Sequence, residues 1–164
     1  MAIWQFTVDL IPRTWVELER GDPELLYDDE GFHDTSATWQ MNQPRVELTG
    51  LISQILPPTE SWSDGIKIWG DQTRNDIQVG YVGTIVESVS ARIDTRGDTS
   101  RICSEIVELA RALDCVLFLP SARTIIMADI KPLTEALYKS RAARFSAAPR
   151  DFIEELAHTA LGKD

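Results

Sequence analysis

Apolar residues alternate with polar ones over several stretches of this chain, which is the pattern of strands that bury one face. In residues 2–10 one side of the alternation is entirely apolar. After residue 60, residues 66–69, 77–82 and 84–94 predict three more strands joined by short connections. In the last of these, the inward side consists of Ile85, Val89, Ala91 and Ile93. Short connections and one polar face predict an antiparallel meander with one side in solvent.

In other parts of the chain the apolar residues recur with the period of an α-helix. Residues 99–114 carry apolar side chains at i, i+4, i+7, i+8 and i+11, beginning with Ile102, after a capping Asp98 or Thr99. Residues 46–56 predict a shorter helix that ends at a pair of prolines, and Pro132 and Pro149 suit the first turns of two further helices. The uninterrupted apolar run in 115–119 predicts an interior strand, and residues 124–128 predict a short strand after it.

The order of these elements predicts the fold class. Strands come in blocks and do not alternate strictly with helices, so we expect an α+β fold: an antiparallel, meander-containing sheet with helices packed mainly on one face. The length of 164 residues fits a single domain spanning residues 1–164. Residues 20–43 show no sustained period and form a long acidic excursion from it.

The charge is strongly uneven along the chain. The formal net charge is -10, and residues 1–82 hold 14 acidic and 5 basic residues against 12 and 11 in residues 83–164. The first half therefore carries -9 of the total. Such a surface repels nucleic acid and anionic membranes and attracts basic proteins. No apolar run reaches the length of about 20 residues that a membrane span needs, and the two cysteines form no CxxC pair, so we expect a cytoplasmic protein.

The densest acidity lies in residues 19–34, where seven carboxylates accompany one arginine. A calcium loop aligned on Gly31 would place Leu26 and Ala37 at required ligand positions, and neither side chain has an oxygen. The only two histidines, His33 and His158, lie far apart without a cysteine pair, which disfavours a zinc site. The sequence predicts no metal and no cofactor.

Nothing in the chain matches a known arrangement of catalytic residues. There is no GxSxG sequence and no histidine close to either cysteine. Asp114 before one strand, with Asp129 and Lys131 after the next, could hold Mg²⁺ in a nuclease, but the surface has the wrong sign for a nucleic acid. We therefore predict no catalytic residues. An enzyme acting on a small molecule stays open as an alternative.

The acidic segment at residues 19–34 and the aromatic residues near it suggest a protein-binding surface. Aromatic side chains among charges are typical of protein-binding hot spots, and all five tryptophans lie in the acidic half. We expect carboxylates to steer a basic partner and Tyr27 or a nearby tryptophan to anchor it. The predicted partner-binding residues are Asp22, Glu24, Tyr27, Asp28, Asp29, Glu30, Asp34 and Trp39. A solubilising loop without a partner is the alternative.

Four segments carry a family resemblance: WGDQTRNDIQVGYV, SARIDTR, LARALDCVLFL and SRAARF. Across residues 65–150 the chain resembles small acidic bacterial proteins that are similar to the immunity proteins of polymorphic toxin systems. The resemblance implies a cytoplasmic protein that binds and blocks a cognate toxin, and it contains no catalytic motif. The predicted function is therefore inhibition of a basic toxin or effector through an acidic surface. An interaction domain with no toxin partner is the alternative.

Overall fold

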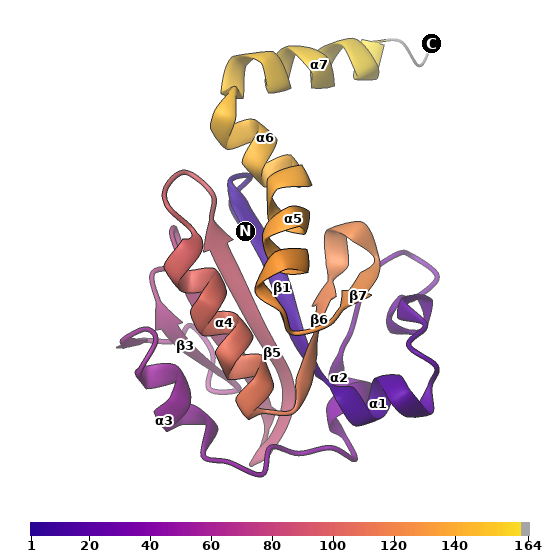
Figure 1. Cartoon of the computed structure of the whole chain (residues 1–164), viewed down its shortest axis with the longest axis vertical. Coiled ribbons are helices and arrows are strands. Elements are labelled where there is room, and N and C mark those ends of the chain that lie inside the picture. The colour runs from indigo at the N-terminus through magenta and orange to yellow at the C-terminus, as the bar shows by residue number, and fades with distance from the viewer. Residues whose placement is uncertain (162–164) are drawn as a thin grey trace.

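A single antiparallel sheet organises the molecule. The computed structural model describes residues 1–161 and orders seven strands as β2-β3-β4-β5-β1-β6-β7 (Figure 1). Strands β3 to β5 form the predicted meander, the unpredicted β2 extends it at one edge, and β1 lies between β5 and β6. The strands are β1 (Gln5–Pro12), β2 (Pro58–Thr59), β3 (Ile66–Gly70), β4 (Asp76–Val82), β5 (Ile85–Asp94), β6 (Cys115–Leu119) and β7 (Thr124–Ile126). The predicted α+β class, with its antiparallel sheet, is confirmed.

The helices lie mainly on one side of this sheet, where α4 and α5 cross it in Figure 1, and α7 projects beyond the rest of the molecule. The helix α6 was not predicted; Ser140 caps its N-terminus, since the Ser140 hydroxyl accepts a hydrogen bond from the Ala143 N–H. The helical segments are α1 (Arg13–Leu18), η1 (Pro23–Leu26), α2 (Ser36–Trp39), α3 (Leu48–Ser53), α4 (Ser100–Ala112), η2 (Pro120–Ala122), α5 (Ile130–Lys139), α6 (Arg141–Ala147) and α7 (Pro149–Leu161).

The main core fills the space between the sheet and these helices. The α4 stripe that begins at Ile102 packs on Val8, Ala91 and Ile93 of the central strands, and α5 adds Leu133. Such burial contributes about 25 cal/mol per Å² of apolar surface, so this layer holds the fold together. We call it the front core.

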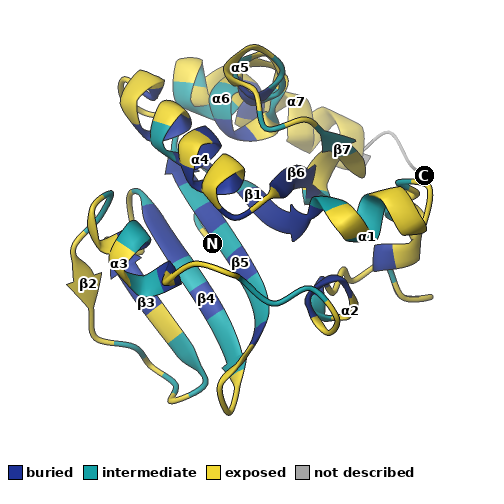
Figure 2. Cartoon of the chain, turned by 60° about the horizontal axis from the view of Figure 1, so that its bottom comes forward, coloured by how far each residue is buried: buried dark blue, intermediate teal, exposed yellow. Residues whose placement is uncertain are grey.

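A second, smaller cluster lies on the opposite face of the sheet. Ile11, Leu26, Val116 and Phe118 are all buried there, with Trp15 and Tyr27 packed against them. We call it the back cluster. Because β6 is covered by the front core on one face and the back cluster on the other, all five of its residues are buried, and it is dark blue throughout in Figure 2. This double burial explains the uninterrupted apolar run in its sequence.

Two placements within the strands differ from the prediction. Ile85 is exposed and Val86 takes the core position, because a bulge pairs Tyr81 with Val86 and Gly80 with Ser88, which leaves Glu87 as the extra residue. Trp4 lies before β1 and outside the core. Its indole N–H donates to the Thr73 carbonyl, and the Arg96 guanidinium lies 4.3 Å from its ring centroid.

Within residues 1–161, every helix is too short or too polar to cross a membrane.

Candidate functional site

Residues 19–34, which we call the acidic loop, are folded and not an irregular excursion. The turn η1 is followed by an isolated bridge between Tyr27 and His33. Two backbone hydrogen bonds close this small unit, from the Asp28 N–H to the Phe32 carbonyl and from the Asp34 N–H to the Leu26 carbonyl, each 2.9 Å. The sequence shows no period here because the unit is a set of tight turns.

Three of the predicted carboxylates build these turns. Asp22 accepts from the Glu24 N–H at 3.0 Å and caps η1. Asp28 accepts from the N–H groups of Glu30 and Phe32, and Asp34 accepts from the Ser36 N–H. Such side-chain turns satisfy backbone donors that no strand or helix pairs. The carboxylates therefore fix the shape of the loop that displays them.

Tyr27 and His33 attach the loop to the sheet. Tyr27 donates its hydroxyl to the Pro120 carbonyl at 2.6 Å, and both rings meet Phe118 edge to face, with centroids 6.0 and 5.7 Å away. His33 Nε2 lies 3.0 Å from the carboxylate of Asp9, a buried residue on the back face of β1. Tyr27 was predicted as a partner anchor. In the structure its ring packs against the back cluster.

Both attachment groups have altered acidity. The hydrogen bond to Asp9 raises the pKa of His33 above its ordinary value, although partial burial opposes this. Burial raises the pKa of the Tyr27 hydroxyl, and the nearby Arg123 guanidinium opposes that shift. Arg123 also pairs with Glu24 at 2.8 Å and lies 4.0 Å from the Tyr27 ring centroid, so it partly neutralises one predicted carboxylate.

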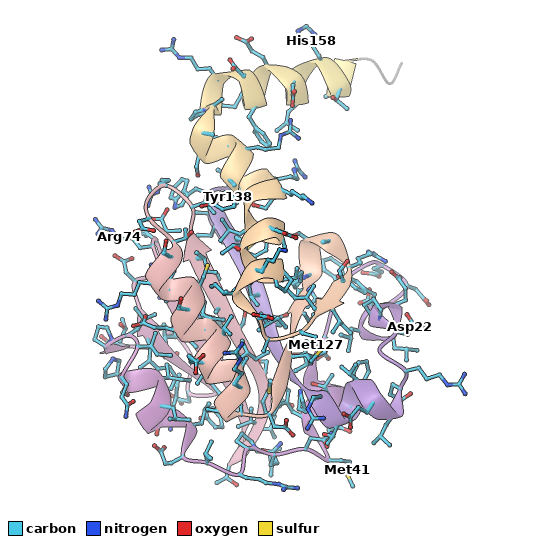
Figure 3. The ribbon with its side chains drawn as sticks, viewed as in Figure 1. Asp22, Met41, Arg74, Met127, Tyr138 and His158 are labelled. Carbon is cyan, nitrogen blue, oxygen red and sulfur yellow. The ribbon has the colours of Figure 1, made fainter. Side chains whose placement is uncertain are left out.

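The outward side of the loop combines charge with apolar surface. Asp29 and Glu30 are exposed and form no ion pair with any residue in 1–161. Phe32, which lies between Glu30 and Asp34 in the sequence, has 69% of its surface exposed, and Leu25 on η1 has 58% exposed. Asp22, from the same loop, lies at an outer edge of the molecule in Figure 3. Neither Phe32 nor Leu25 was among the predicted binding residues, although two large apolar residues within an acidic run were a visible signal.

A comparison of the chain with protein-family models, curated proteins and solved structures finds no match.

The tryptophans of the acidic half differ widely in burial. Trp39 is 1% exposed and belongs to the front core, so the prediction that it contacts a partner is corrected: α2 turns its ring inward. Trp15 packs on the back cluster, and Trp69 is buried with its indole N–H on Ser53. Trp62 is exposed, but it lies in the connection before β3, outside the acidic loop.

The residues considered for catalysis have structural roles instead. Asp114 pairs with Arg13 at 2.9 Å, and Asp129 accepts from the Ile130 N–H at the start of α5. Burial raises the pKa of Cys115 to about 12, which makes its thiol a poor nucleophile. Within residues 1–161 no group of three or more His, Cys, Asp or Glu side chains is arranged to hold a metal.

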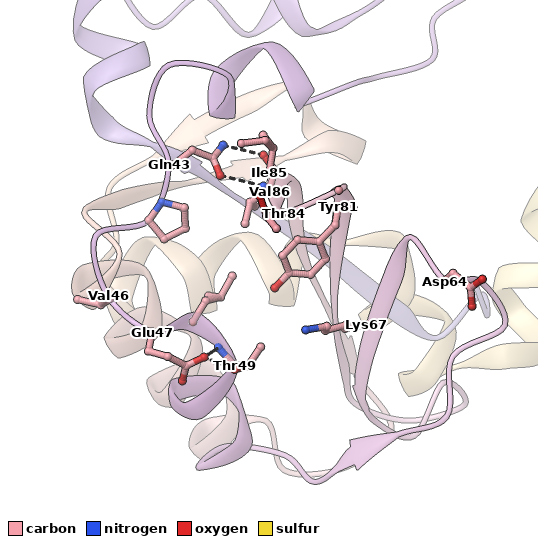
Figure 4. Close-up of a pocket in the computed structure, with 13 residues that line it drawn as sticks. Gln43, Val46, Glu47, Thr49, Asp64, Lys67, Tyr81, Thr84, Ile85 and Val86 are labelled. Carbon is pink, nitrogen blue, oxygen red and sulfur yellow. Dashed lines mark hydrogen bonds between the residues drawn. The ribbon is translucent and has the colours of Figure 1, made fainter.

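A cavity of about 580 Å³ lies between α3 and the β4–β5 hairpin (Figure 4). Glu47 accepts from the N–H groups of Thr49 and Gly50 at the start of α3, and Gln43 exchanges two hydrogen bonds with the Val86 backbone. The Lys67 ammonium lies 5.1 Å from the Tyr81 ring centroid. Because Glu47 and Gln43 are engaged with the backbone, they support the local fold, and Glu47 also accepts a hydrogen bond from the Thr49 hydroxyl.

Proposed function

We propose that this protein inhibits a basic partner protein by docking the acidic loop on it, in the manner of an immunity protein that blocks a toxin. The proposal rests on one observation: exposed carboxylates flank an exposed phenylalanine, Phe32, in the sequence of a loop that its own hydrogen bonds hold in shape. It assigns the protein to the cytoplasm, where the buried thiols of Cys103 and Cys115 would stay reduced.

The carboxylates, the exposed phenylalanine and the folded state of the loop would each contribute differently to binding a basic partner. The carboxylates raise the association rate with a basic surface and suppress binding to acidic ones. They add little affinity where they stay in water. An apolar side chain that enters a pocket of the partner supplies affinity, and the exposure of Phe32 supports this role for it. A loop already folded also loses less conformational entropy on binding than a disordered segment.

The experiment compares variants that separate these contributions. Asp29→Asn with Glu30→Gln removes two charges without touching the carboxylates that shape the loop. Phe32→Ala removes the apolar anchor and keeps every charge. The matched control is Glu60→Gln with Glu154→Gln, two exposed carboxylates in distant parts of the chain. Each protein is used to capture its partner from the native host, and association and dissociation are then measured with the purified partner.

We expect the control to bind like wild type. The loop double variant should associate several-fold more slowly at low salt, with the difference disappearing as ionic strength rises. Phe32→Ala should instead dissociate at least tenfold faster, because hot-spot truncations cost about 2 kcal/mol or more. Equal kinetics for all four proteins would refute the assignment of this surface. A partner whose own activity is unaffected by binding would favour the interaction domain without a toxin.

A further inference from the structure

A cavity of about 720 Å³ opens where β1 and β6 separate, beside the acidic loop. Strands β1 and β6 pair from Pro12↔Cys115 to Asp9↔Phe118 and no further. In this register Pro120 would stand opposite Thr7, and proline has no N–H to donate. The Pro120 carbonyl is also turned away, since it accepts from the Tyr27 hydroxyl and the Arg123 N–H.

This break leaves part of β1 unpaired on its β6 side. The backbone carbonyl of Trp4 points toward the β5 side, because it accepts a hydrogen bond from the Thr95 N–H. The backbone N–H of Arg13 points toward the β6 side, because it donates to the Asp114 carbonyl. Backbone groups alternate sides along a strand, so those of Thr7 point toward β6, into the gap. Thr7 lines the cavity, and in residues 1–161 its hydroxyl has only the Met1 sulfur as partner, a weak acceptor.

The lining has an unusual composition for this protein. The chain carries 26 Asp and Glu residues, yet the described residues that line this cavity include neither type. Four other cavities in the described part of the chain each have at least one carboxylate in their lining. The polar residues of the lining other than serine, threonine and tyrosine are Gln5, His33, Arg92 and Arg141, and the Gln5 amide is engaged with the backbone of Ala2, Gln72 and Arg74.

The two arginines differ in what they can offer a ligand. Arg92 is held by the buried carboxylate of Asp76, with its Nε 2.8 Å from Oδ1, so its charge is already compensated. His33 likewise faces Asp9. Arg141 has no carboxylate partner in residues 1–161, and its guanidinium carbon lies 5.8 Å from the Phe152 ring centroid. Among the arginines of the lining, Arg141 is therefore the one whose charge no described carboxylate compensates.

We propose that this cavity binds a small organic anion, with its carboxylate or phosphate head on Arg141 and the free edge at Thr7 and its apolar body against Phe6 and Ile3. Ligand cavities commonly measure about 300–1,000 Å³ and combine apolar walls with a few convergent donors. Arginine and fixed N–H groups bind both carboxylates and phosphates well. This binding is separate from the proposed docking of the acidic loop on a protein.

The test is a titration of ¹⁵N-labelled protein followed by NMR. Benzoate and phenyl phosphate distinguish the two head groups, benzyl alcohol lacks the charge, and inorganic phosphate lacks the apolar body. We expect at least one of the two organic anions to shift the amide signals of Thr7, Ser121 and Ala142 saturably, and more tightly than benzyl alcohol or inorganic phosphate does.

Variants then assign the binding. Arg141→Gln should weaken the organic anion about tenfold, the effect of losing one hydrogen bond to a charged group. Arg150→Gln removes an equivalent exposed charge from α7, which does not line the cavity, and should have no effect. Ser121→Trp, on the exposed turn η2, should block the cavity and abolish binding. Unshifted amides with both anions, or equal affinities in Arg141→Gln and wild type, would overturn the proposal.

Discussion

The two faces of the sheet are held in very different ways. In the described residues the front core contains 26 buried side chains drawn from strands and helices, whereas the back cluster contains four. The acidic loop depends on the smaller set, with the hydroxyl of Tyr27, the pair His33–Asp9 and the pair Arg123–Glu24 added. Regions with few buried contacts open at a lower free energy than the whole protein unfolds.

This difference separates stability from function in the chain. The front core can keep the molecule folded while the loop adjusts to a partner, because binding segments are drawn from the less stable parts of proteins. Changes to the front core should therefore act on the whole molecule, and changes to the back face should act on the loop alone. Four predictions test this separation, from the largest expected effect to the smallest.

Ile106→Ala should have the largest effect. Ile106 is fully buried in the middle of α4, so its truncation leaves a cavity in the front core and should lower the free energy of unfolding by about 2–5 kcal/mol. Urea denaturation measures this change. Alkylation of the Cys115 thiol should accelerate in parallel, because burial blocks the reagent and raises the pKa of the thiol to about 12 until the core opens. If Ile106→Ala destabilised only the acidic loop and left the unfolding free energy of the whole protein unchanged, the proposed difference between the two faces of the sheet would be wrong.

The pair His33–Asp9 should make the stability of the loop depend on pH. The folded state raises the pKa of His33, so the stabilisation is complete below about pH 6.5, the ordinary value, and is lost as the pH rises through the folded value. An NMR titration of the His33 ring should give a pKa above about 6.5. Asp9→Asn should lower that pKa more than Asp34→Asn, because Asp34 acts only through space. A larger effect of Asp34→Asn would refute the role of Asp9.

Tyr27→Phe should loosen the loop without weakening the core. It removes the hydrogen bond to the Pro120 carbonyl and keeps the ring on Phe118, for a cost of about 1 kcal/mol. Hydrogen exchange at the amides of Asp28 and Asp34 should accelerate about fivefold, while the amides of α4 stay unchanged. Tyr138→Phe, an exposed tyrosine on α5, is the matched control. Equal acceleration in both variants would argue against the anchoring role.

Arg123→Gln should have the smallest effect. Its pair with Glu24 is exposed on both sides, so its loss should cost a few tenths of a kcal/mol to about 1 kcal/mol, with a small addition from the Tyr27 ring. The change in exchange at the loop amides should shrink in high salt. Arg101→Gln breaks a comparable pair with Glu105 on α4 and should leave the loop unchanged. Insensitivity to salt would point to the ring contact instead.

The sequence predicted the parts of the molecule whose patterns are long and local. The alternation in β1, the α4 stripe and the apolar run of β6 each indicated their element, and together they indicated the α+β class. It could not predict that Val86 replaces Ile85 in the core, because the bulge at Glu87 depends on how β4 and β5 pair. Nor could it place Trp39, which short-range patterns left in an irregular segment.

The amino-acid sequence alone determined the charge of this protein, the acidity of its first half and the elements of its front core, since these follow from composition and period. Only the tertiary structure decided that Asp22, Asp28 and Asp34 shape the loop, that Phe32 faces solvent and that Pro120 leaves Thr7 unpaired. Each of these depends on contacts between residues or on the register of strands distant in the chain. Such contacts leave no periodic signal in the sequence.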